Sequence, residues 1–189
     1  MNSWLSDPSL IERARAIRLL VLDVDGVMTD GQLYFQADGQ ETKAFATQDG
    51  QGLKLLRQAG VEVALITGRE SPMVARRAAA LGIEHVFQGR DDKLDVLQTL
   101  IQRLNMDMNL NISLDQVAYC GDDLPDLAPI SRAGLGISVP NAPSYIREHA
   151  DWVTERPGGH GAVREICDGL LDMQGHWDAI LASYLHGKH

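Results

Sequence analysis

The sequence predicts an α/β fold, with a doubly wound, mainly parallel sheet and helices on both of its faces. Short apolar, β-prone runs alternate with longer amphipathic stretches along the 189 residues, which is typical of strand–helix–strand units. Several of these runs end in carboxylates, hydroxyls or glycines, as strands do where a sheet edge binds a ligand. A chain of this length can bury one core, so we expect a single domain over residues 1–189.

The first predicted strand is the aliphatic run 18–22, which ends in Asp23-Val24-Asp25-Gly26-Val27. Burying the aliphatic side chains is favourable, whereas burying an unpaired carboxylate is costly. The two acids are therefore expected at the strand exit, in a crevice that holds a cation. Alternate strand residues point to the same side, so both carboxylates can face one ligand across roughly 6–7 Å. The plain alternative is a turn that only ends the strand.

The other elements follow from periodicity and from turn or capping signals. A β-hairpin over about 31–46 is indicated by Asp38-Gly39 between two β-prone runs. Ser71-Pro72 opens a helix that runs to Gly82. The remaining predictions, in chain order, are helix 8–16, helix 50–60, strand 61–67, strand 85–88, helix 93–104, a disordered or solvent-facing loop 105–113, strand 117–120, a helix near Pro125, strands 134–139 and 152–154, and a helical tail from 162 to about 185.

Composition restricts the partners. The formal net charge of −9 argues against nucleic acid or an anionic membrane as the main partner, although local cations can still bind a small anion in one pocket.

The two cysteines, Cys120 and Cys167, are expected to be buried thiols. No segment approaches the ~20 apolar residues of a membrane span. The stretch Met1–Asp7 shows no leader pattern, so we expect a cytoplasmic protein.

Four predicted strands lead to polar groups of complementary kinds: Asp23 and Asp25; Thr67-Gly68-Arg69; Lys93 after Gly89; and Gly121-Asp122-Asp123 with Asp126. A hydroxyl, a bare backbone amide, a guanidinium and an ammonium all suit phosphate oxygens. Each group has a plain alternative, because Arg69 and Lys93 could be solvated charges and Asp123 could cap the helix opened by Pro125. Four such coincidences at one sheet edge are harder to accept than one shared site.

In this order and spacing the four motifs resemble the haloacid dehalogenase (HAD) superfamily of aspartyl-phosphate phosphotransferases. The resemblance covers nearly the whole chain and implies a Rossmann-like HAD sheet. A closer resemblance, to the small cap-less branch that contains 3-deoxy-D-manno-octulosonate 8-phosphate (KDO 8-phosphate) phosphatases, rests on segments 23–31, 48–52 and 158–165 and on the hairpin. The family usually has arginine where this chain has His160, and the branch often has arginine at Lys54.

The residue chemistry favours phosphoryl transfer through a covalent intermediate. Asp23 is the expected nucleophile, and Asp25 the acid that protonates the leaving oxygen and then activates water. We expect Mg²⁺, held by the carboxylates of Asp23 and Asp122 and by a backbone carbonyl of Val24 or Asp25. Thr67 and Gly68 are expected to bind the phosphoryl group, and Lys93 to neutralise negative charge on Asp23 and on the phosphate. Asp123 is expected to orient Lys93 or a metal-bound water, and Asp126 is a further member of the fourth motif.

The resemblance also implies the substrate contacts. These map to a loop formed by Thr47, Gln48, Asp49 and Gly50, to Lys54, Arg69 and Arg77, and to Asp25, Thr67, Gly68 and Lys93 of the motifs. The chain has room for a hairpin but not for a lid domain between Asp25 and Thr67. We therefore expect Leu33, Tyr34, Phe35 and Phe45 of the hairpin to be buried against another subunit. The resemblance implies a homotetramer in which a neighbour caps each site.

The sequence thus predicts a Mg²⁺-dependent phosphatase of a sugar acid phosphate, with KDO 8-phosphate as the leading substrate, in lipopolysaccharide precursor synthesis. One alternative is a nine-carbon sugar acid 9-phosphate, as in sialic-acid-like pathways, because the motifs do not separate the two. Another is a catalytically silent domain kept for assembly. In a domain that has lost its activity we would expect Asp23, Asp25, Lys93 or Asp122 to be replaced by another residue type. All four are present.

Overall fold

A six-stranded sheet forms the centre of the computed structural model, which describes residues 7–187. Residues 1–6 lie outside the described residues, so the structure does not bear on the prediction made for the N-terminal stretch 1–7. The strand order is β5-β4-β1-β6-β7-β8, and every neighbouring pair is parallel. The strands are β1 (Leu19–Leu22), β4 (Glu62–Ile66), β5 (His85–Phe87), β6 (Val117–Gly121), β7 (Leu135–Ser138) and β8 (Trp152–Val153).

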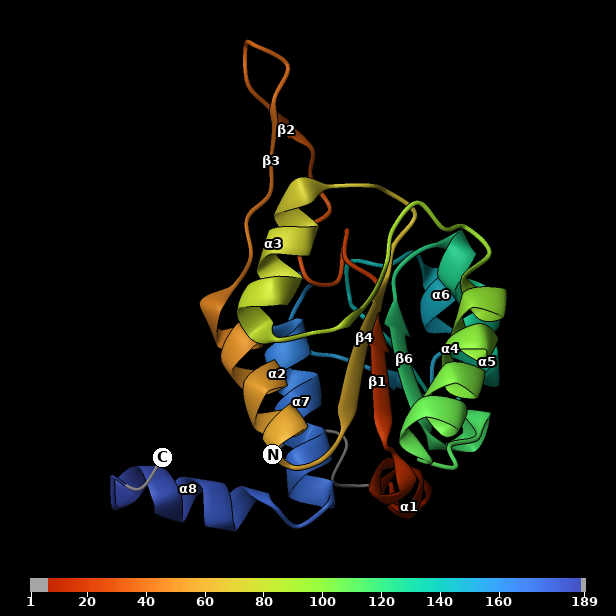
Figure 1. Ribbon diagram of the computed structural model, residues 1–189, viewed down its shortest axis with the longest axis vertical. Coiled ribbons are helices and arrows are strands. Elements are labelled where there is room, and N and C mark those ends of the chain that lie inside the picture. Colours follow the sequence, from red (N-terminus) through yellow and green to blue (C-terminus); the bar gives the residue numbers. More distant parts are fainter. Residues whose placement is uncertain (1–6, 188–189) are drawn as a thin grey trace.

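Helices cover both faces of this sheet (Figure 1), so the predicted doubly wound α/β fold is confirmed. The connections explain the two layers, because right-handed crossovers that run outward from β1 in opposite directions place their helices on opposite faces. One layer holds α2 (Thr47–Gln58), α3 (Pro72–Leu81) and α7 (Ala162–Met173); the other holds α4 (Lys93–Met108), α5 (Leu127–Arg132) and α6 (Ser144–Arg147), while α1 (Pro8–Ala16) lies beside the start of β1. No helix in the described part of the chain is long and apolar enough to cross a membrane.

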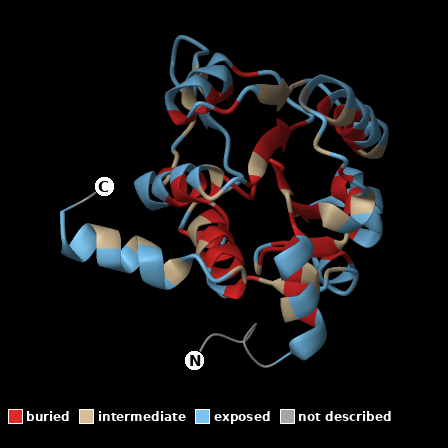
Figure 2. Ribbon diagram, turned by 60° about the horizontal axis from the view of Figure 1, so that its bottom comes forward, coloured by how far each residue is buried: buried red, intermediate tan, exposed pale blue. Residues whose placement is uncertain are grey.

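The core follows the central strands, as Figure 2 shows by the concentration of buried residues there. All four residues of β1 are fully buried, because the strand has neighbours on both edges and helices on both faces. This is why its sequence is a continuous aliphatic run rather than an alternating one. Cys120 and Cys167 are buried free thiols, as predicted.

Helix α2 begins at Thr47, before the predicted start at Gly50. The stretch Thr47–Gly50, expected to be a loop, is therefore the first turn of a helix. An acid near a helix N-terminus is favourable, and the Asp49 carboxylate also accepts the backbone N–H of Arg164 at 2.9 Å. It thereby satisfies one of the unpaired N–H groups at the start of α7. Gly52 lets α2 and α7 pack closely, since a Cβ there would lie 2.9 Å from the Arg164 side chain.

The predicted loop 105–113 is partly helical and partly ordered by its own side chains. Helix α4 continues to Met108. The Asn105 amide then donates to the Ile112 carbonyl at 2.8 Å, while its oxygen accepts the Ile112 N–H at 2.6 Å. The Ile112 side chain is buried. The polar composition of the segment concealed this arrangement, because an asparagine side chain can replace backbone partners and can order a turn.

The C-terminal tail is two helices rather than the expected single helical stretch. Helix α7 ends at Met173, the chain turns at Gly175 with a φ of +77°, and α8 runs over Trp177–Leu185. Glycine is suited to this left-handed turn. Helix α8 extends away from the sheet (Figures 1 and 2) and has no buried residue.

The predicted hairpin is present as β2 (Tyr34–Phe35) and β3 (Glu41–Thr42), with Gly39 at the turn in the left-handed region. It projects beyond the sheet (Figure 1). Leu33, Tyr34 and Phe35 are 45%, 46% and 64% exposed, so they are available to a partner. Phe45 differs from the prediction, because it packs against the core of its own chain.

Replacing Asn105 with Ala should destabilise the protein by about 1–3 kcal/mol, because the backbone groups of Ile112 lose both partners near the core. Urea unfolding followed by circular dichroism would measure the free energy of unfolding. Gln102→Ala, an exposed amide on the same helix, is the matched control and should change stability by less than about 0.5 kcal/mol. Equal effects of the two substitutions would contradict the role given to Asn105.

Candidate active site

The carboxyl ends of β1, β4 and β6 lie side by side, because Leu22 is in register with both Leu65 and Cys120. Asp23 continues the ladder, with its N–H donating to the Cys120 carbonyl at 2.9 Å. Thr67 does the same after β4, donating to the Phe87 carbonyl at 2.9 Å. The side chains that follow these strands are therefore held by the sheet itself.

A pocket of about 260 Å³ opens at this edge. It brings together all four groups of residues that the sequence placed at strand ends. Its lining residues are Asp23, Asp25, Gly31, Thr67, Gly68, Arg69, Asp91, Lys93, Asp122, Asp123, Pro125 and Asp126. Gly31, Asp91 and Pro125 were not predicted as site residues, although Gly31 ends the segment 23–31 that carries the family resemblance and Pro125 was expected to open a helix.

Lys93, the first residue of α4, extends its ammonium group between two acids. Its Nζ lies 2.9 Å from Asp23 Oδ1 and 2.7 Å from Asp126 Oδ1. Its side chain is only 3% exposed. Burial alone would lower the pKa of Lys93, but the adjacent carboxylates of Asp23 and Asp126 raise it. The ammonium therefore stays charged inside the protein.

Asp126 anchors this arrangement. One of its oxygens accepts Lys93 and the Tyr119 hydroxyl, both at 2.7 Å. The other accepts the backbone N–H groups of Asp122 at 3.2 Å and Asp123 at 3.3 Å. Asp123 is exposed and accepts the Leu124 N–H at 2.8 Å, as a helix cap does. Lys93 is thus oriented by Asp126 rather than by Asp123, and contact of Asp123 with a metal-bound water stays a prediction.

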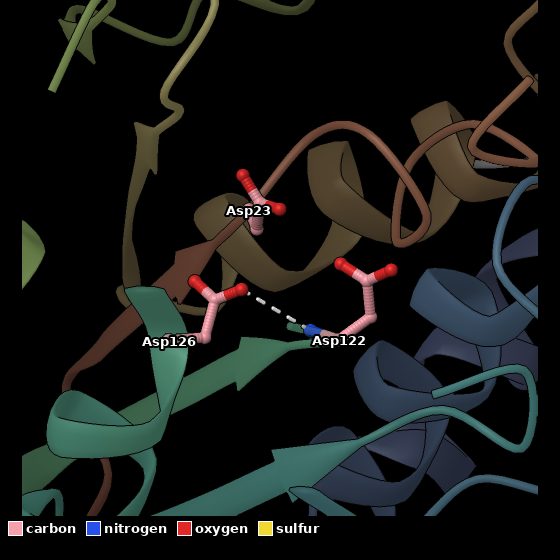
Figure 3. Close-up of side chains that lie close together, drawn as sticks. All are labelled: Asp23, Asp122 and Asp126. Atoms are coloured by element: carbon pink, nitrogen blue, oxygen red, sulfur yellow. Dashed lines mark hydrogen bonds between the residues drawn. The ribbon is translucent and has the colours of Figure 1, made fainter. Parts of the chain in front are cut away.

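Asp23, Asp122 and Asp126 form an acidic cluster, with one oxygen from each lying within 4.8 Å of the others (Figure 3). Burial, and then repulsion by Asp126, raises the pKa of Asp23 well above its usual range, although Lys93 opposes this. Burial and the neighbouring Asp126 and Asp123 raise the pKa of Asp122 to about 7. A cation relieves this repulsion and favours the ionised forms.

The cluster fits a hard divalent cation, which prefers carboxylate and carbonyl oxygens. Both oxygens of Asp126 are already hydrogen-bonded, so the carboxylates of Asp23 and Asp122 are the better ligands. The Val24 carbonyl is also engaged, since it accepts the N–H groups of Val27, Met28 and Thr29 at 3.3, 2.9 and 3.0 Å. Of the two carbonyls that the sequence left open, that of Asp25 is therefore the stronger candidate.

The Asp25 side chain lines the same pocket and contacts basic groups. It forms an ion pair with Lys43 of the hairpin, and its Oδ2 lies 4.0 Å from Arg69 Nε. Arg69, predicted as a substrate ligand, also donates to Glu41 Oε2 at 3.1 Å. Sequence reasoning missed Lys43 and Glu41, and their only signal was two charges on a hairpin otherwise judged apolar.

The residues expected to contact the sugar do not line this pocket, apart from those of the motifs. Asp49 is buried against α7, and the Arg77 guanidinium donates to the Ala46 carbonyl at 3.1 Å while lying over the Phe45 ring. Gly50 packs against Arg77. Thr47, Gln48 and Lys54 are exposed. Their contact with a substrate stays a prediction for an assembly of several chains.

The glycine-rich segment 158–161 supports the loop that carries Asp25. A Cβ at Gly158 would lie 1.8 Å from the Gly26 carbonyl oxygen, so only glycine permits this approach. The Asn141 side chain joins the two segments, donating to that carbonyl at 2.9 Å and accepting the Gly158 N–H at 2.9 Å. His160, which stands where the resembling family has arginine, is exposed.

Known proteins share both the sequence and this architecture. Residues 85–166 match the model of the haloacid dehalogenase-like hydrolases. The 3-deoxy-D-manno-octulosonate 8-phosphate phosphatase KdsC of Salmonella typhimurium is 43% identical over 90% of this chain and 88% of its own length. The chain belongs to this family of HAD-like phosphatases.

Solved structures of the family agree. The KDO 8-phosphate phosphatase of Moraxella catarrhalis, in complex with magnesium, phosphate and KDO, is 48% identical with a TM-score of 0.87, covering 92% of this chain and 97% of its own. The cobalt-bound phosphatase of Haemophilus influenzae is 36% identical with a TM-score of 0.84, covering 92% and 99%. The recognition made from the motifs is confirmed.

Gly26→Ala should lower phosphatase activity by about 10²-fold or more, because an added Cβ would lie 2.0 Å from Asp122 Oδ2 and displace that carboxylate. Steady-state rates and circular dichroism would be measured together. Gly39→Ala is the matched control, since it has a similar φ of +84° but no atom within 4 Å of the added Cβ. If the two variants lose activity equally, backbone strain rather than Asp122 accounts for the loss.

Proposed function

We propose that this protein is a Mg²⁺-dependent phosphatase that hydrolyses KDO 8-phosphate to KDO and inorganic phosphate. The observation that carries this conclusion is the buried Asp23–Lys93–Asp126 arrangement, with Asp122 and Thr67 at the same pocket, in a chain of this family. The reaction belongs to lipopolysaccharide precursor synthesis. A cytoplasmic location, expected from the sequence, stays a prediction.

In the first half-reaction an Asp23 carboxylate oxygen attacks phosphorus. The phosphorus–oxygen bond to the sugar breaks, and the leaving oxygen takes the proton of the Asp25 carboxyl group. Lys93 offsets negative charge as the phosphate approaches Asp23, while Thr67 and Gly68 hold the phosphoryl oxygens. Because Asp126 already holds the Lys93 ammonium in place, no free energy has to be spent on orienting it during the reaction.

In the second half-reaction water attacks the phosphorus of the aspartyl-phosphate. The Asp25 carboxylate takes a proton from that water, and the bond between phosphorus and Asp23 breaks. Phosphate leaves and both aspartates return to their starting states. Mg²⁺, when bound by the carboxylates of Asp23 and Asp122 and by the Asp25 carbonyl, neutralises charge on the transferring group.

One chain offers little room for the sugar. The pocket of about 260 Å³ is below the roughly 300–1,000 Å³ typical of small-molecule sites. The exposed Leu33, Tyr34 and Phe35 of the hairpin supply an apolar surface that a two-residue strand pair cannot bury alone. These observations support a homotetramer in which a neighbouring subunit caps each pocket and completes the sugar site.

A substrate panel tests the proposed function. We expect kcat/KM for KDO 8-phosphate to exceed that for a nine-carbon sugar acid 9-phosphate by about tenfold or more. Treatment with EDTA should abolish hydrolysis, and added Mg²⁺ should restore it. Activity that survives EDTA would contradict the metal requirement. A preference for the nine-carbon substrate would replace the proposed one, and a wild type inactive on every ester would indicate a silent assembly domain.

The double variant Tyr34→Glu with Phe35→Glu tests the assembly, because it places unpaired charge in the proposed apolar interface. Light scattering should show smaller particles. Hydrolysis of KDO 8-phosphate should fall by about 10²-fold, while that of 4-nitrophenyl phosphate should fall much less. Gln40→Glu, which adds one negative charge at the exposed hairpin tip, is the control. A monomer that keeps full preference for KDO 8-phosphate would show that each chain holds a complete site.

A further inference from the structure

Lys43, at the base of the hairpin, extends its buried side chain to the carboxylate of Asp25. The Lys43 side chain is only 1% exposed, although it comes from a projecting hairpin whose neighbouring side chains are largely in solvent. Its Nζ pairs with Asp25 Oδ1 and also lies 3.2 Å from Glu41 Oε1. Burying an ammonium group is costly unless it is paired, so its two acidic partners determine where it lies.

These contacts belong to a ring of alternating charge. Lys43 contacts Asp25 and Glu41, and Arg69 contacts the same two acids through Glu41 Oε2 at 3.1 Å and Asp25 Oδ2 at 4.0 Å. The ring has no net charge when both of its acids are ionised, and it connects the hairpin to the loops that follow β1 and β4. The two cations differ in burial, because the Arg69 side chain is 45% exposed and lines the pocket, whereas Lys43 is enclosed.

Buried ion pairs are weak evidence for stability, since desolvation offsets most of the attraction. A group that must both donate and accept a proton, by contrast, gains from a fixed orientation. Lys43 holds one oxygen of Asp25, which leaves the other on the side of Arg69 and the pocket. Without Lys43 the carboxylate of Asp25, whose side chain is 20% exposed, could rotate toward solvent.

We propose that Lys43 is a positioning residue that holds Asp25 for proton transfer. The inference rests on the proposed function, in which Asp25 gives its proton to the leaving oxygen as the phosphorus–oxygen bond breaks and takes one from the attacking water. It also gives the hairpin a second role, because the element offered to a neighbouring subunit would then orient a catalytic side chain of its own chain.

The test compares substrates with poor and good leaving groups. A sugar oxygen needs a proton to leave, whereas 4-nitrophenolate does not, so loss of Asp25 orientation should affect the first much more. We expect Lys43→Met to lower kcat/KM, which reports the attack on phosphorus and the loss of the leaving group, by about 10²-fold for KDO 8-phosphate and by less than about tenfold for 4-nitrophenyl phosphate. Lys43→Arg, which restores a cation, should recover most of the difference.

Thr42→Val is the matched control, since Thr42 is an exposed neighbour on β3 whose hydroxyl accepts a hydrogen bond from Gln36; its rates should equal those of wild type. Lys43→Gln, a polar substitution, serves if the Met variant does not fold. Adding Lys43→Gln to Asp25→Asn should cost almost nothing further on 4-nitrophenyl phosphate if Lys43 acts through Asp25. Equal losses in kcat/KM on both substrates, full activity of Lys43→Met, or additive losses in the double variant would overturn the proposal.

Failure of the proposed function would be distinguishable, because wild type itself would then not hydrolyse KDO 8-phosphate. The same comparison would be made with glucose 6-phosphate, whose leaving group is also a sugar oxygen. A selective loss with that ester would support the role of Lys43, and an equal loss would overturn it.

Discussion

The arrangement around Lys93 is the constraint on which the rest of the site depends. Its ammonium is buried between Asp23 and Asp126, and neither the cation nor the acids could be buried alone at an acceptable cost. Asp126 is fixed in turn by Tyr119 from β6 and by the backbone N–H groups after that strand. Ion pairs and hydrogen bonds thus connect the loop after β1, helix α4, strand β6 and the loop after β6 at the carboxyl end of the sheet.

This constraint also explains the excess of acid. Asp23 and Asp122 lie close together with their pKa values raised, chiefly by burial. One lysine balances part of the charge and leaves the rest for a divalent cation and for the electrostatics of the reaction. An acidic chain with a net charge of −9 can therefore bind an anionic ester, because binding depends on the local field of the pocket and not on the net charge.

The sequence predicted most of the fold and the motif residues because their physical signals are local. The aliphatic run of β1 with the acids at its end can be recognised from a few adjacent residues, and so can the Asp38-Gly39 turn. The roles that were missed for Asp49, Lys43 and Asp126 share a cause, because the partner of each residue is distant in sequence. Asp49 was expected in a loop but lies in the first turn of α2, where its carboxylate accepts the N–H of Arg164, a residue far along the chain. Lys43 and Asp126 likewise acquire their roles only through contacts that the fold creates.

The central claim is that Asp23 carries the phosphoryl group. The direct measurement is to mix enzyme, Mg²⁺ and KDO 8-phosphate, quench with acid within milliseconds, reduce with borohydride and analyse the peptide containing residues 19–43 by mass spectrometry. Borohydride converts an aspartyl-phosphate to homoserine, so we expect homoserine at position 23 and none at position 25. Unmodified Asp23 during rapid turnover, or modification of Asp25 instead, would contradict the account.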